Sequence, residues 1–435
     1  MRPAFSRSLN YSIYDGSAHA VMLGMGETYL VTFAIALGFS NFYIGLLASL
    51  PMLCAAFAQV LVIDRLIKVT SRRAFILRLA LFQAVLWLPI FILPTNFRSP
   101  WILICLAVLY YSSSHLIAPL WNSWMGDLVS SKIRGAYFGK RNQYRTIVEM
   151  VAFLLAGFIL HYVTDQGALW SFGIIFTVAF VARLVSAWFL AKMEEPPYQA
   201  AGHEHYFSLK TFLKKSVGNN FGRFVLFAFS LLMVTNIASP FFTAYMLREL
   251  HFSYLELSTA LACSLFFQFL SFQNWGLIGD RFGNFKVLKI TGVAVGFLPL
   301  LWLTTQNFYL VLLFQALGGL FWAGFNLAAV NYIFDSVTPQ KLARCVSYYN
   351  FMGNMGTFLG ALLGGLLSKV DFTLLMPTLD LFKGSTYVYY ALFLCSGLLR
   401  FLVVWIFLSK FKEVKKVESH STWSVMRHFI GLSLT

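Results

Sequence analysis

Charged residues are scarce in this chain of 435 residues, of which only 11% are Asp, Glu, Lys or Arg. Soluble domains carry about a quarter charged residues, so this composition excludes an ordinary soluble domain. Acidic residues are the scarcer kind, with 17 Asp and Glu against 33 Lys and Arg. Hydrophobic residues make up 59% of the chain. Apolar runs of about 20 residues recur along nearly its whole length, which predicts a polytopic membrane protein.

The apolar runs are continuous and lack the two-residue alternation of a membrane β-barrel, so they favour helices. Only helices and closed barrels satisfy the backbone in lipid. In chain order the runs predict about twelve membrane-spanning helices, half of them before residue 193 and half after residue 222. The expected fold class is therefore an all-α polytopic membrane protein.

The distribution of basic residues indicates how the chain is oriented. With the N-terminus inside, the outer loops hold only Arg98, Arg248, Lys369 and Lys383 of the 33 basic residues. This bias predicts cytoplasmic N- and C-termini. The net charge of +16 would suggest nucleic acid in a soluble protein. Here it is a topology signal and a contact for anionic membrane lipids, so no nucleic-acid partner is expected.

Several chemical motifs are missing. None of the five cysteines forms a CxxC pair, so the sequence suggests neither a disulfide framework nor a metal site. No GxxxxGK, HExxH or GxSxG motif occurs, which argues against an ATP-driven pump or a membrane-embedded hydrolase. We therefore expect no enzyme activity and no cofactor. The first apolar run is too long for a cleavable signal peptide.

The two halves of the chain resemble each other faintly. Arg183 and Arg400 lie at matching distances before the ends of the sixth and twelfth runs, and Asp127 and Asp335 each begin a loop of matching length. Internal repeats are common in transporters. The expected organisation is an N-terminal six-helix bundle (1–192), a cytoplasmic linker with an amphipathic helix (193–222), a C-terminal six-helix bundle (223–410) and a cytoplasmic tail (411–435).

The loop between the eighth and ninth runs reads GLIGDRFGNFK from Gly276 to Lys286. It resembles the GxxxDRxGxxx(K/R) signature of the major facilitator superfamily, and the expected helices and linker resemble that family too. The segments Met125–Asn142, Ser239–Tyr245 and Trp322–Asn326 look like a poorly characterised bacterial branch of it. The resemblance implies two pseudo-symmetric six-helix bundles, transport by alternating access, and a monomer.

The signature implies a latch at the cytoplasmic side, in which carboxylates pair with basic groups in one conformation only. The alternative is a tight turn with Gly283 at positive φ and solvated charges. A first-half copy keeps Asp64 and Arg65 but has Val60 and Ile67 where the signature has glycine. The expected cytoplasmic gate residues are Asp64, Arg65, Gly276, Asp280, Arg281, Gly283, Lys286, Asp127 and Arg134.

Glu27 lies within the first apolar run, where a charge is costly and usually functional. An apolar site disfavours the charged carboxylate, so Glu27 could exchange a proton near neutral pH or bind a cationic group. The alternative is a structural acid paired with a buried donor such as His19 or His115. In the family, the first, fourth, seventh and tenth helices line the central cavity. The expected substrate- and proton-binding residues are Glu27, His115, Asn236, Thr243, Gln315, Trp322 and Asn326.

Further features are open to structural or functional interpretations. Arg145 and Glu149, spaced i, i+4, are expected to form a local ion pair or part of the gate. Arg183 and Arg400 could snorkel, pair with a carboxylate or bind an anion. Pro240 is expected to kink the seventh helix. Small residues in the eleventh run predict close helix packing or a sliding gate surface: Gly353, Gly356, Gly360 and Gly364.

Together these features predict a secondary active transporter that moves a small-molecule solute, coupled to protons, in the bacterial cytoplasmic (inner) membrane. One alternative is a transporter-shaped receptor or assembly partner that binds without moving its ligand. Another is a lipid or lysolipid transporter, suggested by the 46 phenylalanines. The sequence leaves the substrate, the direction of transport and the coupling ion open.

Overall fold

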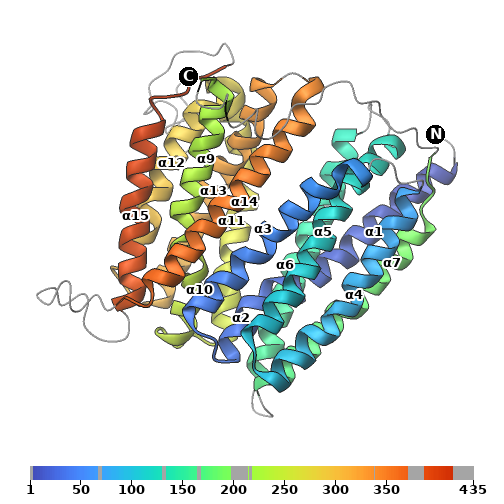
Figure 1. The fold of residues 1–435 in the computed structure, drawn as a ribbon, viewed down its shortest axis with the longest axis horizontal. Coiled ribbons are helices and arrows are strands. Elements are labelled where there is room, and N and C mark those ends of the chain that lie inside the picture. Colours follow the sequence, from blue (N-terminus) through green and yellow to red (C-terminus); the bar gives the residue numbers. More distant parts are fainter. Residues whose placement is uncertain are drawn as a thin grey trace, which may run out of the picture. The chain divides into compact units, whose positions relative to one another are not determined.

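The computed structural model describes residues 3–66, 71–129, 134–163, 168–196, 214, 218–337, 339–370 and 387–414. Within these ranges the chain is helical, with no β-strand (Figure 1). Most of the predicted linker helix, and the tail from residue 415, lie outside the described residues. The all-α membrane fold predicted from the apolar runs is confirmed.

The chain divides into two compact units. The N-terminal unit comprises Met1–Gly202 and His251–Thr259, and the C-terminal unit comprises His203–Leu250 and Ala260–Thr435. Each unit is described by itself below. The finer boundaries of linker and tail stay predictions.

The N-terminal unit is built from six helical segments, the first of which is interrupted. Its elements are α1 (Pro3–Met25), η1 (Glu27–Tyr29), α2 (Leu30–Ala36), α3 (Asn41–Leu66), α4 (Arg72–Phe97), α5 (Pro100–Leu128), α6 (Arg134–Tyr162) and α7 (Ala168–Lys192). Helix α6 begins at Arg134, before the apolar run that predicted it. The first residues of this helix are polar, so the apolar run does not include them.

The C-terminal unit repeats this plan, again with an interrupted first segment. Its elements are α9 (Asn220–Asn236), α10 (Ser239–Arg248), α11 (Tyr254–Phe282), α12 (Asn284–Leu301), α13 (Phe308–Ser336), α14 (Pro339–Leu367) and α15 (Tyr387–Phe407). The first residues of α11 belong to the N-terminal unit. When α1–η1–α2 is counted as one segment and α9–α10 as another, the described residues contain twelve helical segments.

The helices pair in the same way in both units. In the N-terminal unit α1 packs on α6 and α7, and α4 packs on α5 and α7. In the C-terminal unit α9 packs on α14 and α15, and α12 packs on α13 and α15. The matching pairs confirm the internal repeat that the sequence suggested.

Among the described residues, eleven helical segments are long and apolar enough to span a membrane. The remaining segment, α14, is 29 residues long but carries Asn350, Asn354 and several glycines, which lower its hydropathy. The sequence therefore supports eleven spans by composition and a twelfth by its place in the repeat.

The glycines of α14 pack against α9. A Cβ atom at Gly360 would overlap the carbonyl oxygen of Met233, and one at Gly356 would lie 2.5 Å from the Phe229 carbonyl oxygen. Small residues allow such close backbone approach. The packing interpretation of this stripe is confirmed.

Candidate functional site

The first membrane segment is broken at the acidic residue. Helix α1 ends at Met25, and a short 3-10 turn over Glu27–Tyr29 precedes α2. Gly26 weakens the helix here, and it also allows close packing, since a Cβ atom would lie 2.5 Å from the Trp87 ring. The Tyr29 hydroxyl donates to the Phe153 carbonyl on α6 at 2.9 Å and so fixes the turn. The sequence predicted an unbroken span.

The Glu27 carboxylate is held by α5. The hydroxyl of Tyr110, itself fully buried, donates to Glu27 Oε2 at 2.9 Å. The hydroxyl of Tyr111 is a second hydrogen-bonding neighbour. The contact agrees with the alternative of a Glu paired with a buried donor, but the donor is a tyrosine and not His19 or His115. A tyrosine can donate to both the charged and the neutral form of a carboxyl group, so this contact does not require a permanent charge.

His115 hydrogen-bonds within its own helix. Its Nδ1 lies 3.0 Å from the Tyr111 carbonyl oxygen, one turn earlier in α5. The ring is half-buried. With Nδ1–H donating to that carbonyl, Nε2 is the acceptor in the neutral ring.

The seventh segment is broken at the position that corresponds to the first. Helix α9 ends at Asn236, and α10 starts at Ser239 with Pro240 in its first turn. The predicted disruption at Pro240 is thus confirmed. Asn236 Nδ2 donates to the Leu232 carbonyl at 2.8 Å and to Thr357 Oγ1 on α14 at 3.4 Å. Thr243 follows on α10 and is half-buried.

The three candidates on the tenth segment all lie on α13. Gln315 and Trp322 are half-buried and Asn326 is exposed. The Trp322 ring packs edge-on against Phe325 at 5.5 Å between centroids. Glu27 and His115 belong to the N-terminal unit, whereas these residues belong to the C-terminal unit together with Asn236 and Thr243.

A cavity of about 280 Å³ lies in the N-terminal unit, with charged groups in its wall. Helices α1, α4, α5, α6 and α7 all contribute to its wall. The charged residues of the wall are Asp15, Arg141, Arg145 and Arg183, and His19 is also present. Of these, the sequence pointed to Arg145, Arg183 and His19.

Arg183 anchors a buried network beside this cavity. Its Nη2 donates to Gln83 Oε1 at 2.7 Å, and its Nη1 donates to Ser186 Oγ at 2.7 Å. Ser186 in turn donates to Asp15 Oδ1 at 2.7 Å. Arg183 is 3% exposed, so of its three interpretations snorkelling is wrong.

Arg141 completes the network from α6. Its Nη2 lies 3.5 Å from Asp15 Oδ2, and its Nε donates to the Ser12 carbonyl at 3.1 Å. The guanidinium also lies 4.3 Å from the centroid of the Trp121 ring. Buried charges are stable only when paired and hydrogen-bonded, and Asp15 supplies that pairing for two arginines.

Arg145 lies one turn further along α6 and is more exposed. Its Nη2 is 3.3 Å from Glu149 Oε2, and the Arg145 side chain is 41% exposed. The predicted i, i+4 ion pair is present.

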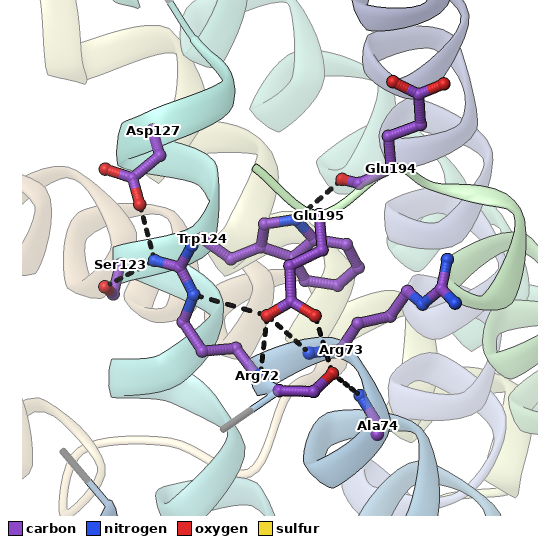
Figure 2. Close-up of polar contacts among 9 residues, drawn as sticks. Arg72, Arg73, Ala74, Ser123, Trp124, Asp127, Glu194 and Glu195 are labelled. Atoms are coloured by element: carbon purple, nitrogen blue, oxygen red, sulfur yellow. Dashed lines mark hydrogen bonds and ion pairs between the residues drawn. The ribbon is translucent and has the colours of Figure 1, made fainter. Parts of the chain in front are cut away.

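A second cluster lies where α4 begins (Figure 2). The buried Arg72 donates to Asp127 Oδ2 at 2.6 Å, and its backbone N–H donates to Glu195 Oε1 at 2.6 Å. Ser71 donates to Glu195 Oε2 at 2.6 Å. Glu195 thereby places a negative charge at the helix N-terminus. The sequence pointed to Asp127 but missed Arg72 and Glu195, and it placed Asp127 in a loop rather than in the last turn of α5.

The start of α12 in the C-terminal unit is stabilised by the same kinds of contact. Gly283 has φ 93°, as the tight-turn interpretation predicted. Asn284 Nδ2 donates to Asp335 Oδ2 at 2.7 Å, and the Phe285 backbone N–H donates to Glu413 Oε2 at 2.9 Å. Glu413 thus corresponds to Glu195. The candidates Gly276, Asp280, Arg281 and Lys286 lie on the neighbouring parts of α11 and α12, whereas the side chains of Asp64, Arg65 and Arg134 lie outside the described ones.

Comparison with known proteins assigns this architecture to a class. The sequence model described as Major Facilitator Superfamily matches residues 17–235 and 224–432. The two matches cover both halves of the repeat. The chain belongs to the Major Facilitator Superfamily and is a multi-pass membrane transporter.

The relatives found do not share one cargo. "Uncharacterized transporter BU588" of Buchnera aphidicola subsp. Acyrthosiphon pisum (strain APS) is 24% identical over 167 residues, which are 38% of this chain and 40% of that protein. The chain thus matches less than half of that relative's length. The solved structure titled nucleoside transporter NupG matches with a TM-score of 0.68 at 15% identity, over 94% of this chain and 99% of that one.

Two further solved structures confirm the fold. A bacterial homolog to the human lysosomal transporter Spinster, in an inward-facing and occupied conformation, has a TM-score of 0.66 at 15% identity, covering 95% of this chain and 100% of that one. An auto inhibited POT family peptide transporter has a TM-score of 0.70 at 12% identity, covering 96% and 99%. At this level of identity the match shows the fold alone, and fold does not set cargo.

Proposed function

We propose that this transporter is a secondary active carrier that moves a small-molecule solute by alternating access, coupled to protons. The observation that carries the proposal is the pair of breaks at Glu27 and Asn236, in the corresponding first segments of the two units. Interrupted helices at corresponding positions of two repeats are the best sequence-level pointer to a transporter's binding site.

Glu27 is the proposed proton carrier. It lies in a 3-10 turn within the first membrane segment, and Tyr110 is its hydrogen-bond donor. The charged groups nearest to it are Arg145 and Glu149 on α6. A carboxyl group in such a place can hold or release a proton without losing its tyrosine contact.

The remaining candidates take supporting roles in this proposal. The solute path is lined by His115, Asn236, Thr243, Gln315, Trp322 and Asn326. The cytoplasmic gate is formed by Asp64, Arg65, Asp127, Arg134, Gly276, Asp280, Arg281, Gly283 and Lys286. The carrier acts as a monomer in the bacterial cytoplasmic membrane with both termini inside, which the distribution of basic residues supports.

The test starts from detergent-purified protein. Thermal unfolding against sugars, amino acids, nucleosides, carboxylates, cationic drugs and lysolipids identifies a ligand, since a ligand at about 100 times its Kd adds about 2.7 kcal/mol of stability. Counterflow of that ligand in proteoliposomes then measures exchange. Binding without exchange would overturn the transport proposal in favour of a receptor.

Proton coupling is tested with Glu27→Gln, which keeps the shape of the side chain. We expect uptake driven by a pH gradient to be lost while counterflow at equal pH persists, because exchange of bound ligand needs no net proton movement. Glu249→Gln removes a carboxylate just beyond α10 and serves as the matched control. If Glu27→Gln kept gradient-driven uptake and its pH dependence, Glu27 would not carry the proton.

A further inference from the structure

We infer that the solute carries an anionic group, a carboxylate or a phosphate, and that this group binds in the cavity of the N-terminal unit at Arg145 and Arg141. The inference rests on the proposed transport function and names the chemistry of its substrate. It also replaces the cationic group considered for Glu27 from the sequence alone.

The charge balance of the cavity is the first argument. Three arginines and one aspartate line it. Glu149, which pairs with Arg145, is the next carboxylate. The three arginines against the two carboxylates of Asp15 and Glu149 leave a net charge of +1 whenever Glu27 is neutral. An uncompensated cation inside a membrane protein is costly, and a bound anion would remove that cost.

The hydrogen-bonding state of the arginines is the second argument. Arg183 donates through all three of its side-chain nitrogens, to Gln83 and Ser186. Arg145 differs, because among the described residues its guanidinium donates to Glu149 alone through Nη2. A guanidinium has five N–H donors in a planar fork that matches carboxylate and phosphate oxygens. The partly exposed Arg145 therefore has donors left for a ligand.

The placement of Arg141 is the third argument. Its guanidinium is fixed between Asp15, the Ser12 carbonyl and the Trp121 ring. A cation held on several sides does not have to be ordered when the ligand arrives, which favours binding. Ile117, Ala118 and Trp121 supply an apolar wall beside it. An anionic head with a short apolar body fits this combination.

The size of the cavity limits the ligand. A volume of about 280 Å³ lies at the lower edge of the range of about 300 to 1,000 Å³ for ligand pockets. A small organic anion fits, and a lipid enters only with its headgroup.

The experiment compares anionic ligands with neutral relatives that lack the charged group. Thermal unfolding of the purified full chain is measured with lactate against lactamide, succinate against succinamide, glucose 6-phosphate against glucose, and inorganic phosphate alone. A further pair, glycerol 3-phosphate against lysophosphatidic acid, separates a soluble anion from a lipid headgroup. We expect stabilisation by at least one anion and by none of its neutral partners.

Two variants with opposite expected effects locate the site. Arg145→Gln should weaken anion binding at least tenfold, which is about 1.4 kcal/mol at 25 °C. Glu149→Gln should strengthen it, by about threefold or more, because it frees Arg145 and removes a nearby negative charge. Arg78→Gln removes an exposed arginine of α4 that does not line the cavity, and should leave affinity unchanged.

The outcomes separate this inference from the transport proposal. If only neutral or cationic ligands bind and exchange, the anion inference is overturned and the carrier stands. If an anion binds through Arg145 but shows no counterflow, the site stands and transport is overturned. A loss of affinity in both Arg145→Gln and Glu149→Gln would show a structural role for the pair and overturn the site.

Discussion

Two adjacent glycines of α13 provide a direct test of the packing inside the C-terminal unit. A Cβ atom at Gly319 would overlap the carbonyl oxygen of Ser264 on α11, whereas no described atom lies within 4 Å of a Cβ atom at Gly318. Gly319→Ala and Gly318→Ala therefore make the same chemical change in the same helix. They differ only in the space around the new methyl group.

The magnitudes follow from this difference. Replacing glycine by alanine within a helix gains up to about 1 kcal/mol from helix propensity, and this gain is common to both variants. Overpacking at Gly319 costs about 1–3 kcal/mol because α11 and α13 must move apart. We expect Gly318→Ala to be as stable as the wild type or about 1 kcal/mol more stable. Gly319→Ala should be about 1–3 kcal/mol less stable than Gly318→Ala.

The assay is equilibrium unfolding in mixed micelles titrated with SDS, followed by far-UV circular dichroism and tryptophan fluorescence. Coincident transitions from the two probes would justify a two-state treatment. Equal stability of the two alanine variants would refute the close approach of α11 and α13 at Gly319. A large loss of stability in Gly318→Ala would contradict the open space around that position.

Three further predictions use the same unfolding assay. Asp15→Asn should destabilise the protein by about 3–5 kcal/mol, because it leaves Arg141 and Arg183 buried without their carboxylate, and a loss below about 1 kcal/mol would contradict the network. Glu195→Gln should lower the free energy of unfolding by about 1–3 kcal/mol, because it weakens a charged hydrogen bond to the start of α4. An unchanged stability would mean that water satisfies these backbone groups equally well. Gly283→Ala should cost about 1–3 kcal/mol because φ is 93° there; an unchanged midpoint would show that the turn adapts.

The sequence was sufficient for the membrane architecture because lipid imposes strict rules on helix length and polarity. The apolar runs predicted the segments, and the i, i+4 spacing predicted the Arg145–Glu149 pair. The early start of α6 at Arg134 was missed, since a helix that extends beyond the apolar run has no hydropathy signal. The break at Glu27 was also missed, although Gly24 and Gly26 precede it, because glycine is common in membrane helices.

The partners of the buried charges could not be predicted from spacing along the chain. Asp15, Gln83 and Arg183 lie on three different helices and meet only after those helices pack. Periodicity identifies a face of one helix and does not identify the helix opposite. For this reason Tyr110, rather than a histidine, was found beside Glu27 only in the structure.

The internal repeat helps to separate scaffold from site. Two polar contacts at helix starts occur in both units: Glu195 and Glu413 each place a carboxylate at the start of a helix, and Asp127 and Asp335 each accept a hydrogen bond from the first residue of α4 or of α12. Arg183 and Arg400 are also repeated, and both donate into their own bundle. Among the described residues, however, Arg400 donates only to neutral acceptors, which are Ser396 Oγ and the carbonyls of Val295 and Thr235.

The acids and extra arginines around Arg183 therefore exceed what the repeated scaffold needs. Arg400 shows that a buried arginine at this point of the fold can be satisfied by neutral groups alone. The N-terminal unit instead adds Asp15, Arg141, Arg145 and Glu149 around a cavity, with Glu27 further along the same first segment. Burying additional charges costs stability. We therefore expect these charges to have a role besides supporting the fold. Among the described residues Arg400 donates to neutral groups alone, so the charged cluster around Arg183 is the part of the N-terminal unit that we propose binds the solute.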